Sequence, residues 1–437
     1  MRKSSDTPIY NAVLKYAGQN AGRFHTPGHS GGKGLPPFFS FASYDITELS
    51  FSDNLENPTG IILGSEQKTA GIYGVERTLY FTSGATTALF CALYALSFDK
   101  KKALITENCH KSVYNALTVF GYEYQTVSLQ KEEIISKLKE YGPNVFVFTS
   151  PDYYGNLLCG AKEICDFCRE NGIYTLCDEA HGSHFVFSSL LPETACSFAD
   201  LTVDSMHKTL PVQTGGAALN VKAKRLVPLT ESARKTLNTT SPSYVTLASI
   251  DYAVSYMEKH GEKLYSKLKK KIDSTRALLE KTGVCVEKSD DFTRLVLKVK
   301  YSAALKNALE KDGIFAEGYS ADKIVFIVTP FNAEYLDRIA AFFKNNPRFV
   351  KKAKTVKISK GILSQTVTDD VGSELVPLKQ AEGRVAFSDV GFYPPATPLI
   401  KKGEVFTREI IDALLRSDKT YGLFKDCASV YKLPSKQ

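Results

Sequence analysis

Tryptophan is absent from this 437-residue sequence, and methionine and histidine are scarce, with three and seven residues. Long apolar runs are lacking too: the most apolar stretch, residues 88–96, is too short to cross a bilayer. The N-terminal twenty residues include basic side chains but no apolar core of a secretory signal. The sequence therefore predicts no membrane association, and we expect a cytoplasmic protein.

The overall composition is that of a globular protein. Hydrophobic residues make up 43% and charged residues 23%, which excludes a disordered, collagen-like or coiled-coil chain. The 55 Lys and Arg exceed the 47 Asp and Glu by only eight, and the densest lysine patches fall in predicted helices or loops. No RNP, KH, helix-turn-helix or zinc-finger pattern is found. We therefore predict no nucleic-acid partner, although a basic nucleic-acid-binding module stays an alternative.

The nine cysteines are an odd number and are scattered along the chain. Cys165 and Cys168 form a lone CxxC in an amphipathic helical pattern, without a second pair at zinc spacing. This pattern indicates buried thiols in a reducing compartment. We predict no metal site.

Short apolar runs alternate with helical patterns through the first half of the chain, which predicts buried parallel strands in an α/β domain. Strands are predicted at 103–106, 123–127, 145–148, 173–177, 201–203 and 216–221, and helices at 112–120, 131–141 and 161–171.

A long helical pattern at 243–280 marks a change of organisation. It is followed by an alternating strand pattern at 293–299, a helix at 303–311, a strand at 323–328 and a helix at 333–344. We predict an N-terminal segment (1–60), a large domain with a linker helix (61–280) and a smaller C-terminal α+β domain (281–437).

Three segments of the large domain carry residues suited to chemistry. Asp178 ends a predicted buried strand, at the edge where α/β folds bind ligands, although it could also cap the next helix. Lys208 follows another strand among Ser, His and Thr, where partial desolvation would lower its pKa for Schiff-base formation. The turn from Ser83 to Thr86 opens a helix with small and hydroxyl residues, which suits a phosphate but is also common in helix caps.

The order of these segments is more specific than any one of them. A phosphate turn, a histidine able to stack (His110), a strand-end carboxylate (Asp178) and a Schiff-base lysine (Lys208) are the groups that pyridoxal 5'-phosphate (PLP) requires. The sequence thus predicts PLP as the cofactor.

Many segments from Phe24 to Glu404 also resemble, in the same order, the fold-type-I ornithine/lysine/arginine decarboxylase family, in its short form without the N-terminal receiver-like domain. The segments that carry the resemblance are 23–29, 45–48, 53–55, 108–113, 151–155, 178–182, 205–209, 241–244 and 393–395. The resemblance implies an aspartate-aminotransferase-like large domain with a mainly parallel sheet, and a smaller C-terminal α+β domain.

The resemblance also implies roles for particular residues. Lys208 would form the Schiff base, Asp178 would pair with the pyridine nitrogen, His110 would stack on the ring, and His181 would lie close to it. Residues implied at the phosphate or elsewhere around the cofactor are Ser83, Gly84, Ala85, Thr86, Ser205 and His207, with Thr240 and Ser241 reaching it from a neighbouring subunit. A homodimer with shared active sites, or a higher oligomer, would follow.

The sequence departs from the family pattern at several positions. Ser30 replaces the usual lysine after Pro-Gly-His, Ala85 removes one hydroxyl from the phosphate turn, and Ala396 replaces a glycine after Tyr-Pro-Pro. These changes affect the expected substrate more than the expected cofactor.

We therefore predict a PLP-dependent decarboxylase (carboxy-lyase) of arginine, lysine or ornithine, with a role in polyamine biosynthesis. Lys208, Asp178, His110 and His207 would be its catalytic residues, and Asp53, Glu56 or Glu404 could receive the cationic side chain of the substrate. An aminotransferase or lyase with the same cofactor, or a catalytically silent PLP-binding protein, remains an alternative.

Overall fold

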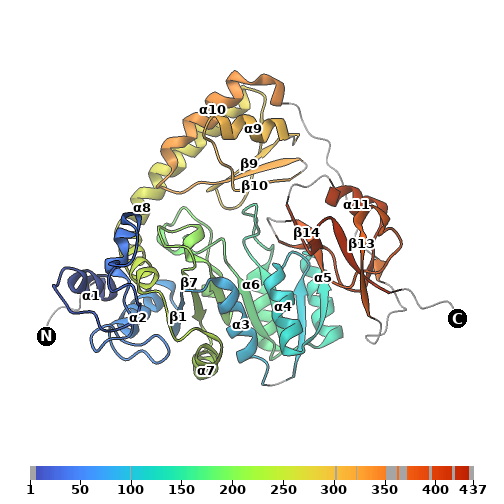
Figure 1. Ribbon diagram of the computed structural model, residues 1–437. Helices are drawn as coiled ribbons and strands as arrows, with labels where there is room; N and C mark the ends of the chain where they lie inside the picture. The colour runs from blue at the N-terminus through green and yellow to red at the C-terminus, as the bar shows by residue number, and fades with distance from the viewer. Residues whose placement is uncertain are drawn as a thin grey trace. The chain divides into compact units, whose positions relative to one another are not determined.

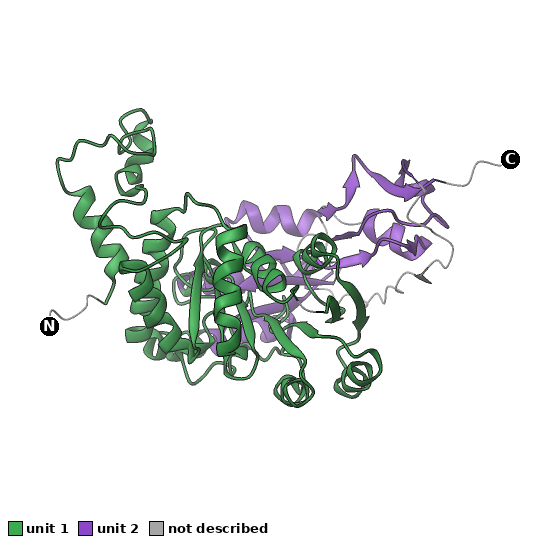
Figure 2. Cartoon of the chain, turned by 90° about the horizontal axis from the view of Figure 1, so that it is seen from below, with its two compact units in different colours: residues 1–271, 289–293, 329–333 green, residues 272–288, 294–328, 334–437 purple. Residues whose placement is uncertain are grey.

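The computed structural model describes residues 6–98, 100–300, 303–320, 322–350, 362–363, 372–392, 396–415 and 419–432, with only the backbone of 362–363. The chain forms two compact units (Figure 2). Unit 1 comprises residues 1–271, 289–293 and 329–333, and unit 2 comprises 272–288, 294–328 and 334–437. The boundaries that we drew from the sequence stay predictions.

A seven-stranded sheet lies at the centre of unit 1, in the order β1-β7-β6-β5-β4-β2-β3. Its strands β1 and β7 are labelled in Figure 1. Its strands are β1 (Arg77–Phe81), β2 (Lys102–Thr106), β3 (Glu123–Val127), β4 (Val145–Thr149), β5 (Tyr174–Asp178), β6 (Leu201–Asp204) and β7 (Ala217–Val221). Strands β2 to β6 pair in parallel, and β1 runs in the same direction because both it and β6 are antiparallel to β7. The predicted mainly parallel sheet is confirmed.

The predicted parallel strand at 216–221 was wrong in its direction. It forms β7, which runs antiparallel to both of its neighbours. Parallel neighbours need a crossover, usually a helix, whereas only a 3-10 turn at Met206–Lys208 separates β6 from β7. The chain therefore returns directly beside β6.

Helices cover both faces of this sheet, and alternate strand residues point to each side. On one face, α3 (Ala85–Ala95), α4 (Lys111–Phe120) and α7 (Val227–Leu237) pack in a core that includes Ile105 and Val147. On the other face, α5 (Lys131–Tyr141) and α6 (Ala161–Glu170) pack in a core that includes Leu104 and Phe146. Apart from the edge strand β3, which is largely exposed, the strands are buried on both sides, as their apolar runs predict.

Unit 1 also contains α1 (Pro8–Ala17), α2 (Ile61–Tyr73) and the greater part of α8 (Tyr244–Lys281). The carboxylate of Asp251 on α8 accepts hydrogen bonds from the backbone N–H groups of Ile9 and Tyr10, at 2.9 and 3.0 Å. Residue 251 thus caps a helix that begins some 240 positions earlier. Helix α8 begins in unit 1 and ends in unit 2.

Unit 2 contains the smaller sheets and confirms the predicted C-terminal α+β character. A four-stranded sheet has the order β10-β11-β9-β8, and three smaller sheets follow later in the chain. The elements are β8 (Cys285–Glu287), β9 (Arg294–Lys298), α9 (Ala303–Lys311), β10 (Gly318–Tyr319), β11 (Lys323–Ile327), α10 (Leu336–Asn345), β12 (Ile362–Leu363), β13 (Ser373–Pro377), β14 (Val390–Phe392), β15 (Pro398–Ile400), β16 (Glu404–Val405), α11 (Arg408–Leu415), β17 (Thr420–Tyr421), β18 (Leu423–Phe424) and β19 (Cys427–Tyr431). The helix predicted from residue 333 opens with a 3-10 turn before α10.

Candidate active site

The residues predicted to bind the cofactor follow the carboxyl ends of strands that run in one direction. Strand β1 leads to Ser83, β2 to His110, β5 ends at Asp178, and β6 leads to the Ser205–Lys208 segment. Carboxyl ends of parallel strands meet at one edge of a sheet, where α/β folds bind their ligands. The topology therefore gathers the four predicted segments at one edge of unit 1.

Lys208 and His181 are in direct contact, with Lys208 Nζ 3.1 Å from His181 Nε2. The His181 ring is only 8% exposed and lies edge-on to Tyr153, with centroids 5.5 Å apart. The backbone N–H of Lys208 donates to the carbonyl of Ser205 at 2.9 Å, which closes the 3-10 turn after β6. The lysine is thus fixed at both its backbone and its amine.

Asp178 is a buried carboxyl group at the end of β5. Burial raises its pKa, whereas the positive charge of Lys208 and a hydrogen bond from the Ala180 N–H lower it, and the net direction is upward. The Ala180 N–H lies 3.1 Å from Oδ1. A buried carboxylate gains most from a second cationic or N–H partner, so this position suits a protonated pyridine nitrogen.

His110 caps the N-terminus of α4. Its Nδ1 accepts the Ser112 backbone N–H at 3.2 Å and lies 2.8 Å from the Ser112 hydroxyl. Burial, together with the charges of Lys208 and Lys111, lowers the pKa of His110 to about 4. The ring is therefore neutral at physiological pH, with its proton on Nε2, and presents a flat face suited to stacking.

A glycine turn joins the predicted phosphate residues from two strands. The Gly84 N–H donates to the Gly215 carbonyl at 2.8 Å, and the Gly216 carbonyl lies 3.1 Å from His207 Nδ1. Ser205 Oγ is 3.4 Å from the same ring nitrogen. The 215–216 turn thus brings the start of α3 and the Ser205–His207 segment together.

The start of α3 has the properties of an anion site. Gly84 adopts φ +91°, and a Cβ at this position would have no atom within 4 Å. The first N–H groups of a helix lack intrahelical partners and carry the positive end of the dipole. Thr86 and Ser83 are exposed, and Ala85 is half-buried and offers only its backbone. These groups suit a phosphate.

Thr240 and Ser241 lie in the exposed turn between α7 and α8. The contact of this region with the phosphate turn is made by Asn238, whose Oδ1 lies 3.4 Å from Ser83 Oγ. Ser241 donates its backbone N–H to Thr239 Oγ1 instead. Thr240 and Ser241 are therefore not among the residues that the contacts within this chain bring to the site.

Asp53, one of the predicted substrate carboxylates, has another role. Burial alone would raise its pKa, but hydrogen bonds from four backbone N–H groups keep the pKa below its usual value. Its Oδ2 accepts from the N–H groups of Gly60 at 2.8 Å and Ile62 at 2.9 Å, at the start of α2. Asp53 therefore holds a loop and caps a helix. Glu56 is exposed, and Glu404 accepts the Lys401 N–H within unit 2.

The positions that depart from the family pattern have well-defined surroundings. Ser30 adopts φ +48° and donates its hydroxyl to the Arg23 carbonyl at 2.9 Å. Ala396 is buried with φ +60°, a conformation in which glycine is less strained. The Tyr393–Pro395 motif before it lies outside the described residues.

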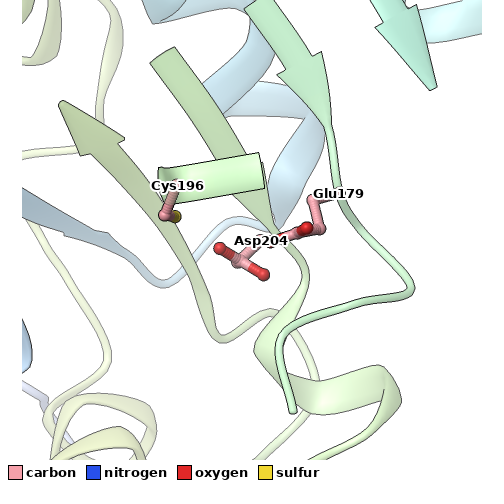
Figure 3. Close-up of side chains that lie close together, drawn as sticks. All are labelled: Glu179, Cys196 and Asp204. Atoms are coloured by element: carbon pink, nitrogen blue, oxygen red, sulfur yellow. The ribbon is translucent and has the colours of Figure 1, made fainter. Parts of the chain in front are cut away.

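The sequence did not single out a buried cluster beside the site, formed by Glu179, Cys196 and Asp204 (Figure 3). Their nearest ligand atoms all lie within 4.8 Å of one another. The Glu179 oxygens already accept hydrogen bonds from Thr194 and Ala195, so we assign no metal to the cluster. The sequence did contain one indication of this cluster, because Asp204 ends β6 in the same way that Asp178 ends β5.

Comparison with known proteins identifies the family. Family models of the Orn/Lys/Arg decarboxylase major domain and C-terminal domain match residues 7–298 and 344–422. The chain belongs to the Orn/Lys/Arg decarboxylase family. This confirms the predicted family and, with it, the prediction of an amino-acid decarboxylase.

Individual proteins of known name are also similar to the chain. An arginine decarboxylase of Bacillus subtilis is 27% identical over 461 residues, covering 94% of each chain. The structure of lysine decarboxylase A from Pseudomonas aeruginosa superposes with a TM-score of 0.78 at 18% identity, over 97% of this chain and 80% of that one. A serine palmitoyltransferase (SPT) structure with a PLP internal aldimine has a TM-score of 0.59 at 14% identity, over 78% and 84% of the two chains. These likenesses confirm the fold-type-I prediction.

Within the part of the chain that the structure describes, every helix is too short or too polar to span a bilayer.

Proposed function

We propose that the edge formed by Lys208, Asp178, His110 and the start of α3 binds PLP and decarboxylates arginine, lysine or ornithine. The observation that carries the proposal is the contact of Lys208 with His181, in a setting where the same lysine charge also acts on Asp178 and His110. Bound PLP supplies an electron sink for the electron pair left behind when a carboxylate departs. Family membership and a PLP-containing structural neighbour support this cofactor.

Each residue would have a distinct task at this edge. Lys208 would hold the cofactor covalently, Asp178 would keep the ring nitrogen protonated, and the neutral His110 ring would stack on the cofactor. The N–H groups at the start of α3, with Ser205 and His207, would hold the phosphate.

Proton transfer would fall to the groups around Lys208. His207 Nδ1 donates to the Gly216 carbonyl, which leaves Nε2 as the nitrogen able to take a proton. Burial lowers the pKa of His207, and the Lys208 charge lowers it further, although the Gly216 carbonyl opposes both. Either Lys208, which contacts His181, or His207 would then deliver a proton to the substrate carbon.

The cofactor assignment has a direct test. Borohydride reduction of the protein reconstituted with PLP should attach the cofactor to the Lys208 peptide, as read by mass spectrometry. Lys208→Ala should lose this labelling, and Lys222→Ala, which changes a lysine just after β7, should keep it. Labelling that persists in Lys208→Ala would refute the assignment.

The substrate is decided by a separate assay. The purified enzyme is incubated with carboxyl-labelled arginine, lysine and ornithine, and both carbon dioxide and the amine are measured. We expect one of the three to be turned over with equal yields of carbon dioxide and amine, consistent with a role in polyamine biosynthesis. Formation of a keto acid without carbon dioxide would indicate an aminotransferase instead.

Exposed aromatic side chains support a homodimer. In the N-terminal segment 24–51, Phe24 and Phe38 are 102% and 81% exposed, and further aromatic rings beside them are partly exposed. Exposed aromatic patches of this kind are typical of protein interfaces. We expect sedimentation to show a dimer that Phe24→Ser and Phe38→Ser together weaken.

Free cysteine thiols, most of them buried, fit a cytoplasmic location.

A further inference from the structure

Two buried carboxyl groups lie close together at the ends of β5 and β6. Glu179 and Asp204 are 1% and 0% exposed, and an oxygen of each lies within 4.8 Å of the other and of the Cys196 sulfur (Figure 3). They come from neighbouring strands: Glu179 follows the last residue of β5, and Asp204 is the last residue of β6. The mechanism proposed above uses neither of them.

Among the residues that the structure describes, no cationic side chain pairs with Glu179 or Asp204. The titratable groups that face it are Tyr73 on α2, Cys196 in the 3-10 turn after Thr194, and Cys177 and Asp178 on β5. Each of these is neutral or acidic. Two like charges this close cannot both persist without solvent, so one carboxyl group must keep its proton.

The hydrogen-bond donors indicate which group is protonated. Glu179 accepts from the Thr194 hydroxyl at 2.5 Å and from the Ala195 N–H at 2.7 Å, so both of its oxygens have donors. Asp204 Oδ2 accepts from Asn220 at 2.7 Å, whereas Oδ1 makes no hydrogen bond of ordinary geometry and has beside it only the Ser183 hydroxyl, which itself makes none. An ionised oxygen with no donor is costly, but a protonated one is not.

We propose that Asp204 stays protonated beside an ionised Glu179 at neutral pH, and that this arrangement positions the two cofactor-binding segments. Glu179 lies between Asp178 and His181 in the chain, and Asp204 precedes the Ser205–Lys208 segment. With one proton retained, the two strand ends lie together and hold Lys208 against His181. With both groups ionised, repulsion would separate the ends. Glu179 and Asp204 are therefore positioning residues.

The pH dependence of the pair follows from its buried state. Burial raises the pKa of Asp204, the neighbouring Asp178 charge raises it further, and Ser183 and Asn220 lower it; burial and Asp204 likewise raise the pKa of Glu179. The folded chain thus holds a proton that the unfolded chain releases above its own pKa near 4. Stability is then lost as pH rises from there toward the folded pKa.

The test compares variants of the full-length chain without added cofactor. For one retained proton, the unfolding equilibrium constant should rise up to about tenfold per pH unit above pH 5. Asp204→Asn, which replaces the acid with a permanently neutral group of the same shape, should lose this component. Asp200→Asn is the matched control, because Asp200 lies just before the same strand and accepts from Thr175 instead. Urea unfolding at pH 5, 6, 7 and 8 measures the difference.

A second measurement uses PLP binding at neutral pH and rests on the proposed function. Asp204→Asn should bind PLP within about threefold of wild type, whereas Glu179→Gln, which places an amide against the donors of Thr194 and Ala195, should bind at least tenfold more weakly. Equal pH slopes in wild type and Asp204→Asn would overturn the proposal, and so would a metal ion that copurifies with the chain and whose removal abolishes the slope. If the wild-type chain shows the pH dependence of unfolding but binds no PLP, the proposed function is refuted and the proposal of a retained proton is supported.

Discussion

The amine of Lys208 and the ring of His181 meet at a distance of 3.1 Å between Nζ and Nε2. The contact joins the segment after β6 to the segment after β5, and it is set in a buried environment by the edge-on ring of Tyr153. A lysine held in this way can exchange a proton with an imidazole without moving far. The pair is therefore the natural place to begin testing the chemistry.

Removing the His181 ring should slow turnover more than it weakens binding. General acid–base partners contribute roughly 10²–10⁴ in rate, so we expect His181→Ala to lower kcat at least about 100-fold, with KM changed much less. His181→Gln, which keeps a polar group near Lys208, should recover part of the loss. His260→Gln, an exposed histidine on α8, is the control. Steady-state kinetics would contradict the role if KM alone changed.

His110 should make the folded chain sensitive to mild acid. Its folded pKa of about 4 lies below the unfolded value of 6.5, so the unfolded chain binds the extra proton between these values. Stability is then complete above pH 6.5 and falls as pH decreases toward 4, by up to about 3 kcal/mol. Urea unfolding of His110→Phe should show a smaller loss over this range. A loss identical to that of wild type would contradict the neutral, partly buried ring.

Gly215 should be essential to the phosphate turn. It adopts φ +93°, and an added Cβ would lie 2.5 Å from the Thr82 carbonyl oxygen. Gly215→Ala should therefore displace the turn that joins Gly84 to His207 and raise the Kd for PLP at least tenfold. Gly142→Ala is the matched control, since its φ is +58° but no atom lies within 4 Å of the added Cβ. The control should cost about 1 kcal/mol of stability and leave the Kd unchanged.

Glu66 should be the most costly carboxylate to remove from unit 1. It is fully buried and pairs with Arg77 at 2.8 Å and Arg234 at 2.5 Å. Glu66→Gln leaves the buried guanidinium of Arg234 without its anion and leaves Arg77 with Glu231 alone, so we expect a loss of about 3–5 kcal/mol in urea unfolding. Glu231→Gln, which removes the partly exposed partner of Arg77, should cost under about 1 kcal/mol. Equal losses in the two variants would contradict this ranking.

Local patterns predicted much of this fold and site. Apart from the polar edge strand β3, the strands from residue 102 to 204 have mainly apolar runs, and their helices have clear amphipathic spacing, so both could be located before the structure was known. Asp178 ends such a strand and Lys208 lies shortly after the end of another, which predicts that both lie at the ligand-binding edge.

Features that depend on contacts between residues far apart in the chain could not be predicted from the sequence. The direction of β7 depends on a turn instead of a crossover helix, and the role of Asp53 depends on backbone N–H groups up to ten residues away. The approach of Glu179 to Asp204 depends on the register of β5 and β6, in which Asp178 lies opposite Val203. No local pattern of apolar and polar residues specifies such a register.

The sheet order also bears on synthesis of the protein by the ribosome. Strand β1, which leads into the phosphate turn, pairs with β7 alone, and β7 ends at Val221. A nascent chain that has released β1 through β6 therefore carries an unpaired apolar strand while the following residues are translated. Such a chain contains Asp178 and Lys208, but its Gly215–Gly216 turn has not yet formed. Under the proposed function, a nascent chain would bind the cofactor only after β7 has been translated, and β1 would stay unpaired until then.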